Sequence, residues 1–184
     1  MQAAVQSDYV RLEDYLASEE TSEIRHEYLG GAVYAMAGET RAHNTIALNV
    51  ATSIRQRLKS PCKPYMAGVR VNFQLRQDQY YYYPDVVVTC DSRDTDPRII
   101  RHPKLIIEVL SESTERIDRR EKFLAYTTID SLEEYALLAQ VGAEATVFRR
   151  ANDWRAEKVT SAGDTLVLSS LRLSLALSDL YEGI

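Results

Sequence analysis

Two acidic residues stand inside runs of apolar residues, where a carboxylate is costly. Asp85 opens the valine run of "PDVVVTC", and Glu108 interrupts "KLIIEVL" at residues 104–110. Side chains alternate along a strand, so both faces of the second run are apolar and Glu108 breaks one of them. Burying an unpaired carboxylate costs several kcal/mol, so each acid must be protonated, paired with a cation or bound to a metal.

Two acids on neighbouring buried strands are typical ligands of Mg²⁺, because this ion takes oxygen ligands in an octahedron and keeps some of its waters. A backbone carbonyl next to Glu108 could add a ligand, and we assign this role to Val109. Mn²⁺ is the alternative ion. A structural ion pair is the alternative to any metal, with Lys104, Arg70 and Lys122 as available partners.

The segment after the Glu108 strand supplies a candidate cation. "STERIDRREKFLAYTTID" opens with Ser and Thr caps and carries good helix formers to Tyr126, and "SLEEYALLAQ" then returns to strand composition. Lys122 lies four residues after Asp118 on one face of this helix, so its ammonium could reach a metal held by the two acids. A solvated Asp118–Lys122 pair is the alternative.

The amino-terminal hairpin supplies a third carboxylate. "RHEYL" and "AVYAMAG" flank two consecutive glycines, which predicts strands near 25–29 and 32–37. Glu27 falls in the first of them. An exposed strand residue is the alternative to any functional role for Glu27.

The helix predicted between residues 40 and 58 carries a histidine. Its apolar residues recur every four positions, and His43 lies on the same stripe, either as a proton-transfer group or as a core histidine. The runs "YMAGVRVNFQLR", "QYYYYPDVVVT" and "KLIIEVL" that follow are expected to form one sheet. Beyond the second helix, "AEATVFRR-AN-DWRAEKVT" predicts a hairpin and "RLSLALSDL" a half-buried strand.

Aromatic and basic residues near the acids are the candidate nucleic-acid contacts. In an extended chain, Tyr81 and Tyr83 point to the side of the first acid and could stack on bases, although tyrosine is also a good strand former. Arg116, Arg119 and Arg120 could contact a phosphate backbone, and a solvated helix face is the alternative.

Composition narrows the class of protein. The chain fits one domain, residues 1–184, and its 22 Lys and Arg against 27 Asp and Glu give a net charge of −5. This balance argues against a protein that coats nucleic acid, so any contact with DNA needs a local basic patch.

The two cysteines and the apolar segments indicate the compartment. Cys62 and Cys90 sit in no CxxC or Cys/His spacing, which argues against a zinc ribbon, a thioredoxin-type motif and a disulfide framework. A cytoplasmic protein is therefore expected. No signal peptide is predicted, and no run of about 18 apolar residues predicts a membrane span.

The ordered motifs resemble a known family. Pro84-Asp85, the strand with Glu108 and the helix with Lys122 resemble the PD-(D/E)XK nuclease superfamily. Within it, "PDVVVTC", "LIIEVLSEST", "DRREKFLAY" and "EEYALLA", with "RHEYLGGAVYAMAG" and His43 before them, are similar to the Uma-two family of restriction endonucleases over nearly the whole chain.

The resemblance implies an α/β (α+β) fold with a restriction-endonuclease-like core, in which helices flank a mixed β-sheet, with additional carboxy-terminal strands. It also implies that Asp85 and Glu108 bind Mg²⁺ for hydrolysis of DNA phosphodiester bonds. Glu27 matches an acidic position of the family's amino-terminal motif, which implies a further carboxylate at the metal or a partner for Lys122. One position departs from the superfamily motif: Leu110 stands where a lysine is expected two residues after the second acid, so Lys122 is the candidate displaced lysine.

The prediction is therefore a Mg²⁺-dependent DNA endonuclease that forms a homodimer. A catalytically inactive binding or structural protein with the same fold is the alternative, favoured by Leu110 and the net negative charge. A hydrolase of another phosphate ester is the third possibility, because carboxylates and Mg²⁺ do not name the substrate.

Overall fold

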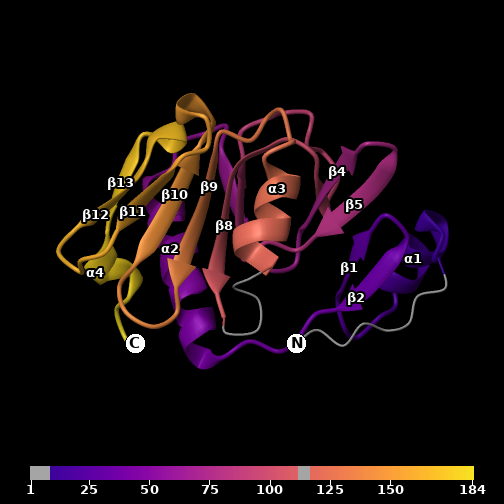
Figure 1. Cartoon of the computed structure of the whole chain (residues 1–184), viewed down its shortest axis with the longest axis horizontal. Coiled ribbons are helices and arrows are strands. Elements are labelled where there is room, and N and C mark those ends of the chain that lie inside the picture. The colour runs from indigo at the N-terminus through magenta and orange to yellow at the C-terminus, as the bar shows by residue number, and fades with distance from the viewer. Residues whose placement is uncertain (1–8, 112–116) are drawn as a thin grey trace.

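The computed structural model describes residues 9–111 and 117–184, which form three β-sheets and the helices that cover them (Figure 1). The first helix, α1 (Leu12–Glu19), has Arg11 at its N-cap, with no capping hydrogen bond from the side chain. Arg116 and the Ser and Thr caps predicted beside it lie outside the described residues.

Pro84 divides the tyrosine–valine run into two strands that belong to different sheets. β5 (Asp78–Tyr82) pairs with β4 (Arg70–Leu75), whereas β6 (Val86–Thr89) pairs with β8 (Pro103–Leu110). Proline has no N–H for the strand ladder and is excluded from central strands, so the chain changes sheets here. The prediction that these runs form one sheet was wrong.

The six-stranded sheet is mixed. Besides β6 and β8 it contains β3 (Lys63–Met66), β9 (Glu134–Ala139), β10 (Ala145–Arg149) and β11 (Ala156–Val159). The strand order is β11-β10-β9-β8-β6-β3, with β8 and β9 parallel and the other pairs antiparallel. The predicted strand–helix–strand unit after Glu108 is thus confirmed.

Helices cover both faces of this sheet. α2 (Arg41–Arg57) packs its predicted apolar stripe onto the face that carries Ile107. α3 (Phe123–Tyr126), with β4 and β5, covers the face that carries Ile106. Both the side-chain alternation expected for β8 and the predicted fold class, a mixed sheet flanked by helices, are confirmed. A π-helical segment, Ile117–Lys122, leads directly into α3.

A five-stranded sheet carries the amino-terminal hairpin. It contains β1 (His26–Leu29), β2 (Ala32–Ala35) and β7 (Ile99–Ile100) in the order β2-β1-β5-β4-β7. β1 and β2 pair antiparallel as predicted, and both glycines between them adopt positive φ, 57° and 105°, which favours this residue type. Tyr15 of α1 stacks on Tyr28 of β1 with ring centroids 4.9 Å apart, which fixes the helix against the sheet.

Two hairpins complete the carboxy-terminal region. β10 and β11 pair antiparallel as predicted, and β12 (Thr165–Leu168) pairs with β13 (Leu173–Ala176), which is followed by α4 (Leu177–Leu180). Figure 1 shows this second hairpin and α1 at opposite ends of the molecule. Within the described ranges, no helix is both long and apolar enough to cross a membrane.

Cys62 and Cys90 form a disulfide, which corrects the prediction that the chain contains none. The antiparallel pairing of β3 with β6 places Lys63 opposite Thr89, so the cysteines that adjoin these two residues also face each other. Their separation of 28 residues forms no local motif, so spacing alone could not reveal the contact. The inference of a cytoplasmic location from unpaired cysteines therefore loses its basis.

Candidate catalytic site

Asp85 and Glu108 lie side by side at one end of the β6–β8 pair. Asp85 immediately precedes β6, and its N–H donates to Glu108 Oε2 over 3.2 Å. Val109 N–H donates in turn to Asp85 Oδ2 over 2.6 Å. The residues are 8% and 3% exposed, so the two acids that sequence reasoning singled out share one dry site.

Lys122 reaches this site from the helix that follows β8. Its Nζ lies 3.2 Å from Glu108 Oε1 and 3.1 Å from Glu27 Oε1, and the ammonium stands 5.5 Å from the ring centre of Tyr82. Tyr83 N–H also donates to Glu27 Oε1, over 3.4 Å. The predicted partnership of Glu27 with Lys122 is therefore present, and Glu27 is buried rather than exposed.

Tyr126 is a contact that sequence reasoning missed. Its hydroxyl donates to Glu108 Oε1 over 3.2 Å. Burial, and next the charge of Glu108, raise the pKa of Tyr126 well above its ordinary value, so the hydroxyl keeps its proton and remains a donor. The spacing offered a signal, because Tyr126 follows Lys122 by four residues and so shares its helix face.

His43 contacts Asp85 from the other side. It lies in the first turn of α2, where Thr40 Oγ1 accepts from the His43 N–H over 3.1 Å and caps the helix. His43 Nε2 lies 2.9 Å from Asp85 Oδ1 and 3.9 Å from Glu39 Oε1. Among the described residues, Glu39, His43 and Asp85 offer ligand atoms within 4.8 Å of one another, and sequence reasoning missed Glu39.

Three buried carboxylates surround a buried lysine at this site. Glu27, Asp85 and Glu108 are buried carboxylates, and Lys122 is the buried ammonium beside them. The donors are hard oxygens with several lone pairs each, which suit Mg²⁺. The residues present therefore fit a divalent cation.

Known proteins are similar to this chain in sequence and in fold. Residues 12–178 match the sequence profile of the Uma2 family, described as "Putative restriction endonuclease". The chain belongs to the Uma2 family. Two uncharacterized proteins of Synechocystis sp., slr1290 and sll1609, are 35% and 30% identical to it, over 94% and 69% of this chain and 91% and 73% of their own lengths.

A solved structure extends the comparison to the fold. The crystal structure of a "putative nuclease belonging to DUF820" from Anabaena variabilis matches with a TM-score of 0.76 at 17% identity, over 94% of this chain and 97% of that one. The resemblance inferred from the motifs and the predicted nuclease-like fold are both confirmed.

The two candidate stacking tyrosines of this Uma2 protein differ in placement. Tyr81 is buried in the aromatic cluster with Tyr15 and Tyr28, so its ring offers little surface to a base. Tyr83 is also buried, but it lines a small cavity and its hydroxyl donates to Glu19 over 2.8 Å. Burial, and next this hydrogen bond, raise the pKa of Tyr83 far above its ordinary value.

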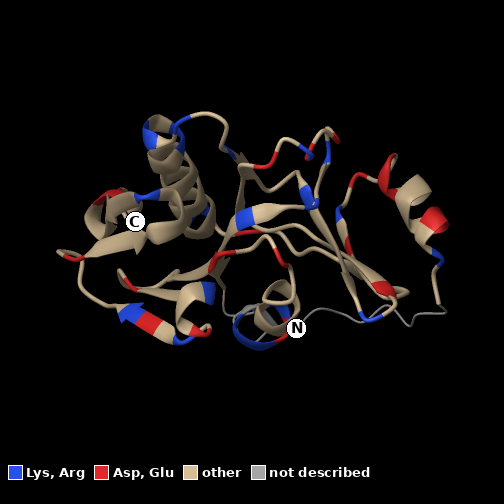
Figure 2. Ribbon diagram, turned by 90° about the horizontal axis from the view of Figure 1, so that it is seen from above, with Lys and Arg blue, Asp and Glu red and all other residues tan. Residues whose placement is uncertain are grey.

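The candidate basic contacts lie beside Lys122. Arg119 is half-buried and Arg120 is exposed, both in the π-helical segment that ends at Lys122. Figure 2 shows basic and acidic segments interspersed along the ribbon rather than gathered on one face. Any nucleic-acid contact of this Uma2 protein must therefore be local, as the net charge predicts.

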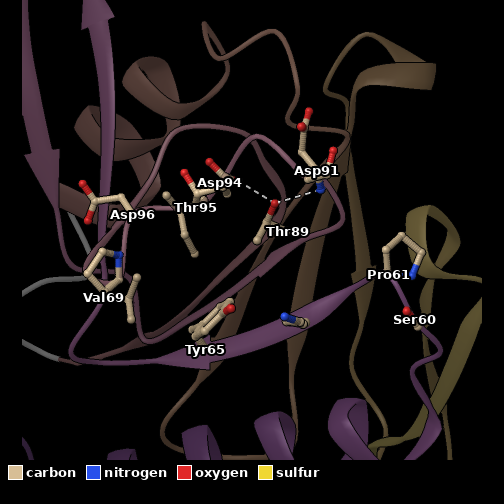
Figure 3. Close-up of a pocket in the computed structure, with 13 residues that line it drawn as sticks. Ser60, Pro61, Tyr65, Val69, Thr89, Asp91, Asp94, Thr95 and Asp96 are labelled. Carbon is tan, nitrogen blue, oxygen red and sulfur yellow. Dashed lines mark hydrogen bonds between the residues drawn. The ribbon is translucent and has the colours of Figure 1, made fainter.

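A cavity of about 580 Å³ opens at the other end of β6, roughly 13 Å along the strand from Asp85. Its polar groups are already bonded to one another, since Thr89 Oγ1 donates to Asp94 Oδ2 over 2.6 Å and accepts from Asp91 N–H over 3.1 Å (Figure 3). Asp91 also pairs with Arg93. The cavity is thus separate from the candidate catalytic site.

Proposed function

We propose that this Uma2 protein is a Mg²⁺-dependent endonuclease that hydrolyses phosphodiester bonds of DNA. The observation that carries the proposal is the ammonium of Lys122, 3.2 Å from Glu108 Oε1. Leu110 occupies the strand position of the ordinary lysine and is buried, so a lysine from the next helix supplies the missing cation. The family description "Putative restriction endonuclease" supports the same activity.

Asp85, Glu108 and the carbonyl of Val109 would hold the ion, with Mn²⁺ as an alternative because His43 offers a nitrogen donor close by. When bound, Mg²⁺ polarises the phosphate and lowers the pKa of a coordinated water. His43 holds Asp85 in place through its 2.9 Å contact, and Val109 N–H does the same from the strand side.

Lys122 interacts with the phosphate undergoing attack. Its ammonium stabilises the charge that develops on the phosphate oxygens, and Glu27 keeps it charged and oriented in the buried site. In the reaction the oxygen of water forms a bond to phosphorus, one P–O ester bond breaks, and the departing oxygen takes up a proton. The product strand ends are a phosphate and a hydroxyl.

Plasmid cleavage tests the proposal directly. Purified wild-type protein with Mg²⁺ should nick or linearise plasmid, and Asp85→Ala should not. Asp130→Ala is the matched control, because it removes an exposed aspartate and should cut like wild type. Equal cleavage by the wild type and Asp85→Ala would identify the activity as a contaminant, and a panel of other phosphate esters would show whether DNA is the preferred substrate.

A catalytically inactive, dimeric binding protein is the second candidate, and the burial of Leu110 at the lysine position favours it. It predicts no cleavage of any nucleic acid and no rise in melting temperature with divalent cations. Sedimentation of the purified protein tests the homodimer that both candidates assume.

A further inference from the structure

A second cavity, of about 200 Å³, lies beside the chain segment that leads to Asp85. We call it the arginine pocket; it is lined by Arg25, Arg70, Arg98, Tyr83, Glu19 and Glu20. Tyr83 precedes Asp85 by two residues, about 7 Å of extended chain. Gly68 also lines the pocket, and its neighbour Ala67 donates its N–H to the Asp85 carbonyl over 3.2 Å. The pocket thus contacts the backbone that positions Asp85.

Arg70 points to an anionic ligand. It is 4% exposed, and its Nη1 has no hydrogen-bond partner among the described residues. A buried cationic donor without a partner is costly, and native structures rarely keep one without a ligand, ion or water. Its guanidinium lies 5.9 Å from the ring centre of Tyr81, which fixes its direction. A phosphate supplies the several acceptor oxygens that a guanidinium fork matches.

The other two arginines are free to rearrange. Arg25 is exposed and lies over the Tyr83 ring, 5.8 Å from its centre. Arg98 pairs with Glu20, and with side chains 57% and 51% exposed this pair is weak enough to open for a ligand. Glu19 is already occupied, because it accepts from the Tyr83 hydroxyl and from His26 N–H.

We propose that the arginine pocket binds a phosphate of the nucleic-acid strand other than the phosphate that is hydrolysed. This inference rests on the proposed nuclease function and assigns a specific set of residues to the DNA partner. Three guanidiniums face two carboxylates in the pocket, so it is cationic, whereas the neighbouring carboxylate site is anionic. The strand would be held at the pocket and presented to the carboxylates.

Binding of a fluorescent DNA duplex without divalent cation tests the pocket separately from cleavage. Arg25→Ala combined with Arg98→Ala should weaken binding about tenfold and reduce the slope of log Kd against log salt by about two, one for each arginine removed. Arg155→Ala is the control for loss of charge, because this exposed arginine lies on the distant β11 hairpin, and it should bind like wild type. Unchanged affinity and slope in the double variant would overturn the proposal, whatever the outcome of the cleavage assay.

Two further arms identify the source of the phosphate. Inorganic phosphate should raise the melting temperature of the wild type and not of Arg70→Met. If Arg70→Met does not fold, the Arg25→Ala, Arg98→Ala protein replaces it. Duplexes with 5′-phosphate and 5′-hydroxyl ends should bind equally, because the proposed ligand is an internal phosphodiester. Stabilisation by inorganic phosphate with unchanged DNA binding in the double variant would mean a free anion site and contradict the proposal.

Discussion

Two buried glutamates on adjacent strands, Glu108 on β8 and Glu134 on β9, show how differently this fold treats a carboxylate. Glu134 accepts from Arg149 Nε over 2.8 Å, from Ser169 N–H over 2.9 Å and from Ser170 N–H over 2.8 Å. The Ser170 hydroxyl donates to it as well. Glu134 therefore forms a hydrogen-bonded structural ion pair with Arg149, and its contacts with Ser169 and Ser170 connect β9 to the carboxy-terminal region.

Glu108 lies instead among other carboxylates. It shares one lysine with Glu27 and lies next to a third carboxylate, Asp85. A fully hydrogen-bonded ion pair is typical of a structural site, whereas several carboxylates in contact are typical of a metal or catalytic site. The contrast predicts that the two glutamates will respond in opposite ways to the same substitution.

The largest effect is expected on cleavage. Glu108→Gln keeps the side-chain volume and removes a proposed metal ligand, so we expect plasmid cleavage to fall on the order of 10³-fold. Glu134→Gln, assayed at a temperature at which it is folded, should retain cleavage within a few-fold. Comparable losses in both variants would mean that Glu108 acts on activity through stability alone.

The next largest effect on cleavage is expected from substitution of Lys122. Lys122→Ala should lower kcat on the order of 10²-fold, because charge on the phosphate loses its stabilising ammonium. The Mg²⁺ concentration required for half-maximal rate should not rise, since a cation next to the metal has been removed. Lys104→Ala is the control: it deletes a lysine paired with Glu133 near the surface and should leave kcat unchanged. A higher Mg²⁺ requirement with unchanged kcat would contradict the role given to Lys122.

The free energy of unfolding without metal should fall more in Glu134→Gln than in Glu108→Gln, the reverse of their effects on cleavage. Glu134→Gln leaves Arg149 without its buried carboxylate, so the free energy of unfolding should fall by about 2 to 4 kcal/mol. Glu108→Gln relieves repulsion among three carboxylates and should change this free energy by less than about 1 kcal/mol, or raise it. Urea unfolding in EDTA measures both. A larger loss for Glu108→Gln than for Glu134→Gln would show that Glu108 is mainly structural.

The smallest effect is expected at Tyr126. Tyr126→Phe keeps the packed ring and removes one hydrogen bond to Glu108 Oε1, so cleavage should fall about fivefold, the equivalent of about 1 kcal/mol. Tyr135→Phe is the control variant; this residue lies on β9, the strand next to the one that carries Glu108. A loss for Tyr126→Phe as large as that for Glu108→Gln would mean that the hydroxyl takes part in the reaction itself.

Local pattern was sufficient to predict the main elements and both acids. The apolar alternation around Glu108, the stripe of α2 and the paired glycines before β2 each depend on residues close in sequence. Lys122 was identified through the family motif: Leu110 stands where the motif has a lysine, so a lysine from elsewhere in the chain was needed.

Long-range pairing was not predictable from the same patterns. The separation of β5 from β6 into two sheets, the Cys62–Cys90 disulfide and the approach of Glu39 to Asp85 all depend on which strands and helices become neighbours. Arg70 was considered a partner for the acids, but its place in a separate pocket follows from the register of β4.

A crystal structure of the protein soaked in Mn²⁺, with anomalous diffraction used to locate the ion, tests most directly whether Asp85 and Glu108 hold a divalent cation. We expect a peak bound by carboxylate oxygens of both Asp85 and Glu108, with Lys122 next to it. A peak held by Glu39, His43 and Asp85 without Glu108, or no peak at a Mn²⁺ concentration that supports cleavage, would contradict it.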